Sequence, residues 1–230
     1  MLLRFLAAFT LIFFSLAVSA EGISLNQSRI VFPQSEKSQT AQILNDTDKP
    51  VLVQATILKD IEGESIDKFI VTPPLFKVEP RKEFSMRVFP NNVSDLPKDR
   101  ESIFYLKTRV IPSTNKSEDS KSLVFVTAFV IKLIYRPDNI DVPDVTDFKK
   151  ITLDRKGNKW QFNNPTPYYM TLVGLSIDGD IKQGSILIAP FDSYSIDYQI
   201  KNPTATIWYF LNDFGVTTDK HIFGEDNKKS

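Results

Sequence analysis

The sequence predicts an all-β protein made of two small β-sandwich domains. Short runs rich in β-branched and aromatic residues alternate with turn-forming residues along most of the chain, which is typical of antiparallel sandwiches. No segment shows a convincing helical periodicity. The chain has 230 residues, which is enough for two domains of ordinary size after a leader segment.

The first 20 residues have the pattern of a secretory signal peptide. Arg4 precedes an apolar centre, and small residues precede the expected cleavage after Ala20, so the mature chain would begin at Glu21. The chain has no cysteine, so its cores would depend on apolar burial and not on disulfides. No later stretch is apolar for long enough to span a bilayer. We therefore expect a mature chain that does not insert into a membrane and that resides in the periplasm of a Gram-negative cell.

Composition argues against several classes of function. The 28 basic and 28 acidic residues balance, which disfavours an electrostatic nucleic-acid binder. The single histidine, His221, and the absence of cysteine leave little material for a histidine-based catalytic site or a zinc site. No glycine-rich phosphate loop is visible, and no spacing singles out a pair of catalytic carboxylates. The sequence predicts a non-enzyme without a cofactor or metal.

The N-terminal domain is expected to contain seven or eight strands, which suggests an immunoglobulin-like sandwich. Turn signals occur at residues 45–48, 61–64 and 90–92. The expected strands are Ile23 to Phe32, Thr40 to Asn45, Val51 to Lys59, Phe69 to Thr72, Leu75 to Val78, Glu83 to Phe89, Ser102 to Ile111 and Leu123 to Tyr135.

A domain boundary is expected after Arg136-Pro137, where DNIDVPDV interrupts the strand pattern. The predicted domains are residues 21–138 and 139–230. The second domain should also be a β-sandwich, with hairpin turns at residues 157–158 and 178–180. Its expected strands are Ile151 to Leu153, Lys159 to Asn163, Tyr169 to Ile177, Ser185 to Ile188, Tyr194 to Gln199 and Ile207 to Asn212.

The run from Leu123 to Pro137, LVFVTAFVIKLIYRP, is long for one ordinary strand and apolar on both faces. Lys132 and Arg136 interrupt it too soon for a membrane helix. It could be a central strand that the domain buries on both faces. It could instead be an edge strand that keeps a face and a backbone edge for a partner. The run itself does not decide between these readings.

Six motifs occur in an order and spacing that resemble the PapD-like family of periplasmic fimbrial chaperones. They are residues 24–29 (SLNQSR), 69–74 (FIVTPP), 96–102 (LPKDRES), 131–137 (IKLIYRP), 164–169 (NPTPYY) and 212–215 (NDFG). The resemblance covers nearly the whole mature chain. It implies two immunoglobulin-like sandwiches in a boomerang arrangement with an interdomain cleft.

The resemblance also implies a function without catalysis. Such a chaperone binds, folds and caps pilus subunits by donor-strand complementation and delivers them to an outer-membrane usher. A subunit of this kind lacks its last strand, and the chaperone supplies one. The residues that would supply it are Leu123, Phe125, Thr127, Phe129 and Ile131, with Thr127 smaller than the large apolar residue expected at that place.

Two further groups of residues are assigned by the same resemblance. Arg29 and Lys132 match the two basic residues that hold the C-terminal carboxylate of the subunit. Glu101, Arg136 and Asp213 match a salt-bridge network that orients the two domains. Treated as an exposed ion pair, that network would matter more for domain geometry than for stability.

The connection at residues 113–122 is short and the chain has no cysteine pair, which resembles the short-loop branch of the family. The free protein could form a self-capping dimer, because an exposed apolar strand invites association. The alternative function is a secreted two-domain sandwich that binds a sugar or a protein directly. In that case the long strand would be fully internal.

Overall fold

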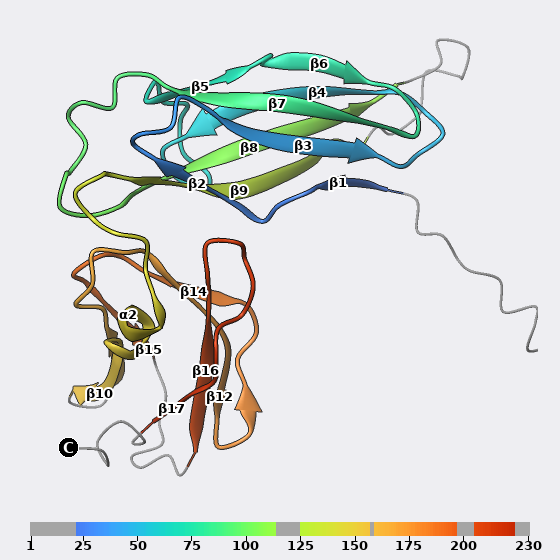
Figure 1. Ribbon diagram of the computed structural model, residues 1–230. Coiled ribbons are helices and arrows are strands. Elements are labelled where there is room, and N and C mark those ends of the chain that lie inside the picture. The colour runs from blue at the N-terminus through green and yellow to red at the C-terminus, as the bar shows by residue number, and fades with distance from the viewer. Residues whose placement is uncertain (1–21, 114–124, 157–158, 197–204, 224–230) are drawn as a thin grey trace, which may run out of the picture.

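The computed structural model describes residues 22–113, 125–156, 159–196 and 205–223. The signal peptide predicted for residues 1–20 and the predicted donor residue Leu123 lie outside these ranges. The described chain forms two sandwich domains set at an angle to each other, with one short helix near their connection (Figure 1). The prediction of an all-β protein with two β-sandwich domains is confirmed.

The N-terminal domain contains two packed sheets. One sheet has the strand order β1-β3-β7-β5 and the other the order β2-β9-β8-β4-β6. The strands are β1 (Ile23–Leu25), β2 (Arg29–Pro33), β3 (Gln39–Asn45), β4 (Val51–Leu58), β5 (Phe69–Thr72), β6 (Leu75–Val78), β7 (Lys82–Pro90), β8 (Ser102–Pro112) and β9 (Thr127–Arg136).

Alternation of buried and exposed residues builds the core between these sheets. In β4, Val51, Val53 and Ala55 are buried and the residues between them are exposed. The rings of Phe32 and Phe69 pack with centroids 5.3 Å apart. The core is therefore of the apolar kind that a chain without cysteine requires.

The predicted single strand from Ile23 to Phe32 is wrong. The structure divides it into β1, which pairs with β3 in one sheet, and β2, which pairs with β9 in the other. Between them, the Asn26 backbone N–H donates to the carbonyl oxygen of Gln42 (3.1 Å). A β-favouring run does not reveal that its two halves pair with different sheets, and this is why the sequence missed the break.

The C-terminal domain also has two sheets, with orders β10-β11-β15 and β13-β12-β16-β17, and β14 pairs with β12. The helix α2 (Val145–Lys149) precedes them and begins with a capping box in which Asp144 accepts from the backbone of Thr146 and Asp147. Five residues are too few to show a helical period, so the sequence did not predict it. The strands are β10 (Thr152–Lys156), β11 (Lys159–Asn163), β12 (Met170–Ile177), β13 (Asp180–Ile181), β14 (Ser185–Ile188), β15 (Ser193–Ile196), β16 (Thr206–Leu211) and β17 (His221–Ile222).

His221 lies in an aromatic environment in this domain. Its ring stacks on Trp208 with centroids 6.0 Å apart and meets Phe210 edge-on at 5.0 Å. The histidine therefore contributes to packing. Among the described residues, no helix is long and apolar enough to cross a membrane.

Candidate functional site: a half-free strand edge beside two cations

Strand β9 is central in its sheet over one half and at the edge over the other. On one side β8 pairs with it from Thr127 to Tyr135. On the other side β2 runs parallel to it and pairs only with the residues from Lys132 to Arg136. The backbone edge from Thr127 to Ile131 therefore has no strand beside it in the described chain. The interpretation as a central strand therefore describes the half from Lys132 onward, and the interpretation as an edge strand describes the half before it.

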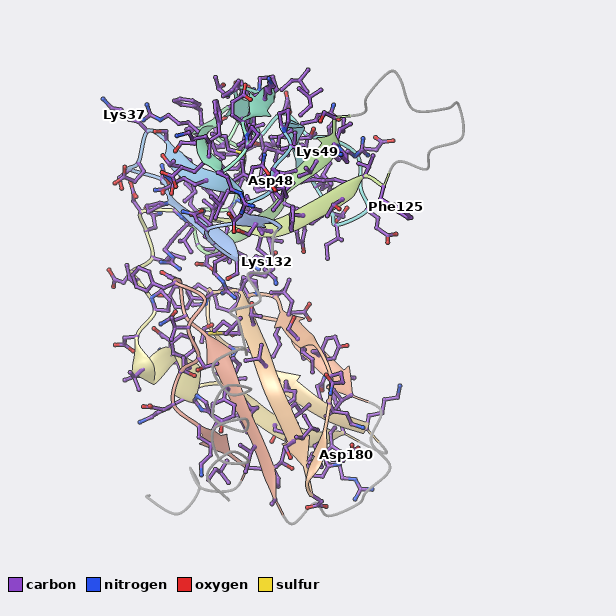
Figure 2. All side chains as sticks on the ribbon, turned by 90° about the vertical axis from the view of Figure 1, so that its right-hand side faces the viewer. Lys37, Asp48, Lys49, Phe125, Lys132 and Asp180 are labelled. Atoms are coloured by element: carbon purple, nitrogen blue, oxygen red, sulfur yellow. The ribbon has the colours of Figure 1, made fainter. Side chains whose placement is uncertain are left out.

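The side chains along the free half differ in their accessibility. Phe125 precedes β9 and is 75% exposed, Thr127 is exposed, and Phe129 is only partly buried against the N-terminal core. Ile131 is 9% exposed and belongs to that core. Of the predicted donor side chains that the structure describes, Phe125 and Thr127 are therefore the most accessible to a partner. Figure 2 shows Phe125 at one side of the N-terminal domain, well apart from Lys132.

Arg29 and Lys132 lie side by side at the end of the free edge. They are direct neighbours in the parallel register of β2 and β9, so their side chains emerge on the same face of the sheet. Lys132 lies on the side of the N-terminal domain that faces the C-terminal domain (Figure 2). Arg29 is 7% exposed, and its Nη1 donates a long hydrogen bond to the carbonyl oxygen of Leu211 (3.5 Å). Its buried Nε has no hydrogen-bond partner.

The electrostatics of these two cations favour an added anion. Burial lowers the pKa of Arg29, although the charges of Asp213 and Glu101 oppose that shift. Burial lowers the pKa of Lys132 as well, and the neighbouring charge of Arg29 adds to the effect. Within the described residues, neither cation forms an ion pair. A carboxylate placed between them would supply charge-assisted hydrogen bonds and offset their mutual repulsion.

A buried ionic network joins the domains close to this pair. Arg136 donates to Glu101 (Nε to Oε1, 2.8 Å). Its two terminal nitrogens also donate to the two carboxylate oxygens of Asp213 (2.7 and 2.9 Å), which makes a bidentate salt bridge. The second oxygen of Glu101 accepts the backbone N–H of Tyr169 (2.7 Å). The side chains of Arg136 and Glu101 are only 6% and 2% exposed. The description of this network as an exposed ion pair is therefore wrong, and removal of either Glu101 or Arg136 would leave a buried charge without its partner.

Sequence reasoning missed other contacts between the domains. The Glu101 backbone N–H donates to the carbonyl of Pro167 (2.9 Å), and the Arg100 guanidinium lies 4.9 Å from the centre of the Phe191 ring. At Gly215, where φ is +75°, an added Cβ would collide with the Ser28 hydroxyl. The sequence contains no local signal for these contacts, because the two residues of each contact lie far apart in the chain.

The described residues contain no group of three or more histidine, cysteine, aspartate or glutamate side chains that could hold a metal ion. Within the part of the chain that the structure describes, the site presents a strand edge without a neighbouring strand, and this edge leads to two cations that form no ion pair. Such a site is suited to binding an extended polypeptide with a negative charge at one end.

Two angled sandwiches, a half-free strand and a two-cation site together define a class of two-domain β-sandwich proteins whose exposed strand edge is suited to pairing with another chain. The family models for the PapD N-terminal domain, a pili and flagellar-assembly chaperone domain, and for the C-terminal domain of the pili assembly chaperone PapD match residues 22–141 and 146–222. The chain therefore belongs to the PapD family of pilus assembly chaperones.

Individual relatives are similar along most of their length. The chaperone protein FocC of Escherichia coli is 29% identical over 94% of this chain and 95% of that protein. The chaperone protein PapD of E. coli is 34% identical over 84% of this chain and 82% of that protein. The crystal structure of the E. coli chaperone DraB superposes with a TM-score of 0.74 at 28% identity, over 88% of this chain and 95% of DraB.

Proposed function

We propose that this protein is a periplasmic chaperone that binds, folds and caps fimbrial subunits by donor-strand complementation and delivers them to an outer-membrane usher. The observation that carries the proposal is the half-free strand β9, whose unpaired edge ends at Arg29 and Lys132. Membership of the PapD family supports the proposal that the partner is a pilus subunit. It also supports the periplasmic location, together with the signal peptide expected at residues 1–20.

The free edge restricts how a subunit strand can bind. A strand whose C-terminal carboxylate is held by Arg29 and Lys132 cannot continue past Lys132, because β2 occupies the edge from there onward. It must therefore lie along Thr127 to Ile131 and run in the same direction as β9. Its backbone pairs with that edge, while Phe125 and Thr127 enter the groove that the missing subunit strand leaves open.

The two cations fix the register of the bound strand. Each charge-assisted hydrogen bond to a carboxylate contributes about 1.5–3 kcal/mol, and the bond forms only when the chain end lies between the two side chains. A buried large side chain on the donor strand contributes about 1.5–3 kcal/mol before ordering costs. The carboxylate site thus fixes the position of the subunit strand along β9, and the strand edge supplies most of the contact between chaperone and subunit.

Co-expression in the periplasm with the subunits encoded beside this chain tests the proposal. A one-to-one complex that co-purifies with the tagged protein and disappears with Lys132→Ala is the expected result. Subunits that accumulate normally without any complex would refute the chaperone function. That result would favour the alternative of a secreted sandwich that binds a sugar or protein directly.

A further inference from the structure

The C-terminal domain contains a cavity that the proposed function leaves unused. It has a volume of about 620 Å³ and lies between the helix α2, the loop at residues 212–218 and the strand β17 (Figure 1). We name it the α2 cavity. Its volume falls within the range of about 300–1,000 Å³ that is usual for small-molecule sites. Its lining contains none of the donor residues or carboxylate-binding residues of the N-terminal domain, so it is separate from the proposed subunit site.

The inner wall and the mouth of the α2 cavity are apolar. Phe148 is buried and stacks on Phe210 of the C-terminal core, with ring centroids 5.8 Å apart. Around the mouth, Phe214 is 88% exposed, and Val142 and Val145 are also exposed. These side chains converge on one cavity, so an apolar group that filled it would remove their surface from water.

The loop that carries Phe214 is held by its own hydrogen bonds. The side-chain oxygen of Asn212 accepts the backbone N–H groups of Phe214 and Val216 (both 3.0 Å). The Thr218 hydroxyl accepts the backbone N–H of Phe210 (3.1 Å). This wall of the cavity is therefore pre-organised, and a ligand does not have to order it first.

The charged side chains that line the cavity favour an anion. Two of the three carboxylates are already engaged, because Asp144 accepts from the backbone at the start of α2 and both oxygens of Asp213 belong to the interdomain salt bridge. Among the described residues, Lys149 and Lys220 form no ion pair, and Asp219 is the one lining carboxylate without a partner. Two cations thus face one free carboxylate, which leaves an excess of positive charge.

The cationic and the apolar parts of the cavity lie at different ends. In β16, Trp208 lies opposite His221, and Phe214 follows beyond the end of that strand. Lys149 lies near Trp208, because both also line a smaller hollow beside the cavity. Along α2, Val145 begins the helix and Lys149 ends it. A ligand with its anionic group at Lys149 would therefore direct an apolar chain towards Phe214 and away from the tryptophan.

We infer that the α2 cavity binds a single-chain amphiphile with an anionic head, of the fatty acid class. The head lies between Lys149 and Lys220, and the chain covers Phe148 and extends to Phe214. Residues 224–230, GEDNKKS, contain no apolar side chain that could fill the cavity instead. Because the loop at residues 212–218 also carries Asp213, the ligand lies against the segment that joins the two domains.

Dodecanoate and its brominated forms are the probes. The chain has two tryptophans, Trp160 and Trp208, and both line the hollow beside the cationic end of the cavity. Bromine quenches tryptophan fluorescence at short range, so quenching reports on this part of the C-terminal domain. At saturation, 2-bromododecanoate should quench more strongly than 12-bromododecanoate, because its bromine lies beside the carboxylate. Equal or reversed quenching, or no saturable quenching below the micelle concentration, would overturn the inference.

Two neighbouring lysines supply a matched test of the charge. Lys149 lines the cavity, whereas Lys150 does not and pairs with Asp147 (2.8 Å). Lys149→Gln should weaken dodecanoate binding about threefold, and Lys150→Gln should leave it unchanged. Asp219→Asn, which removes the free carboxylate, should tighten binding. Equal losses with the two lysine variants would indicate a general charge effect and count against the site.

Two exposed side chains of one loop supply a matched test of the apolar contact. Phe214 lines the cavity and Val216 does not. Phe214→Ser should weaken dodecanoate binding about fivefold, and Val216→Ser should leave it unchanged. Dodecylamine, which has the same chain and the opposite charge, should bind at least about fivefold more weakly than dodecanoate.

The remaining outcomes exclude other ligands and places. Binding to vesicles of dioleoylphosphatidylglycerol without binding of dodecanoate would assign Phe214 to a membrane surface and overturn the inference. Quenching that neither Phe214→Ser nor Lys149→Gln alters would place the probe outside the α2 cavity, with the same consequence. All these measurements use the free protein without a subunit, so the co-expression result for the proposed function does not affect them.

Discussion

Arg29 and Lys132 are two partly or fully buried cations that lie next to each other and have no carboxylate partner among the described residues. Protein structures normally pair buried charges, since an unpaired one is costly. Arg29 looked like an ordinary solvated residue in the sequence, and only the resemblance to a family singled it out. Its burial arises because the C-terminal domain covers it near Leu211, which no local pattern could predict.

The first prediction concerns these two side chains. Lys132→Ala and Arg29→Ala should each weaken binding of a subunit or of its C-terminal peptide by about tenfold to a hundredfold, because each removes a charge-assisted hydrogen bond. The protein should remain folded and exported. Lys107→Ala is the control, since Lys107 points from neighbouring β8 to the same sheet face, two residues along the strand from the position paired with Lys132. A similar loss with Lys107→Ala would point to a general charge effect.

The second prediction is a pH dependence of binding. Burial and the charge of Arg29 hold the pKa of Lys132 below its ordinary value, so this lysine loses its proton at a lower pH than a solvated lysine does. Since the carboxylate needs the charged form, affinity should fall as the pH rises through the lowered pKa. Titrations of the peptide between about pH 7 and about pH 10 test this. Lys132→Arg should flatten the profile, because arginine keeps its charge throughout; a profile that Lys132→Arg leaves unchanged would assign the titration to another group.

At the scale of the element, strand β9 takes two different positions in its sheet along one continuous segment. From Lys132 onward it is an inner strand between β2 and β8, and before Lys132 it is an edge. The short length of β2 creates this difference, because β2 starts only at Arg29. An exposed apolar edge is normally a liability for aggregation, and here it is left open beside the cation pair.

The third prediction tests which side chain enters the subunit. Phe125→Glu should weaken subunit capture about tenfold or more, because it replaces an accessible apolar anchor with a charge that cannot be buried. Ile181→Glu makes a comparable change at an exposed apolar side chain of the C-terminal domain and should have no effect. Equal capture by the two variants, measured as complex yield, would show that Phe125 is not a donor residue.

The sequence predicted individual strands better than their partners. The bounds of β5 and β6 agree with the expected runs from Phe69 and Leu75, because turn residues and prolines delimit both. The division of the first run into β1 and β2, and the half-free state of β9, depend on which strands lie beside them. Such pairings are long-range, and the periodicity of one segment does not encode them.

At the scale of the whole molecule, the two domains are joined by charges that differ in their burial. Glu101 and Arg136 both belong to the N-terminal domain, and Asp213 is the carboxylate that the C-terminal domain adds to them. The Asp213 side chain is 27% exposed, so its pairing is less costly to break than that between Glu101 and Arg136. The family resemblance predicted that these three residues form one network, but only the structure shows how far each of them is buried.

The fourth prediction uses this difference to separate domain orientation from stability. Asp213→Asn should leave the Glu101–Arg136 pair intact and lower the free energy of unfolding by only about 1–3 kcal/mol. It should nevertheless loosen the angle between the domains and, through the contact of Arg29 with Leu211, weaken carboxylate binding. Because the chain has no cysteine, spin labels at Lys37→Cys and Asp180→Cys report a single interdomain distance (Figure 2). A broader distance distribution is expected in Asp213→Asn than in the labelled parent, and an unchanged distribution with normal peptide affinity would show that Asp213 does not orient the domains.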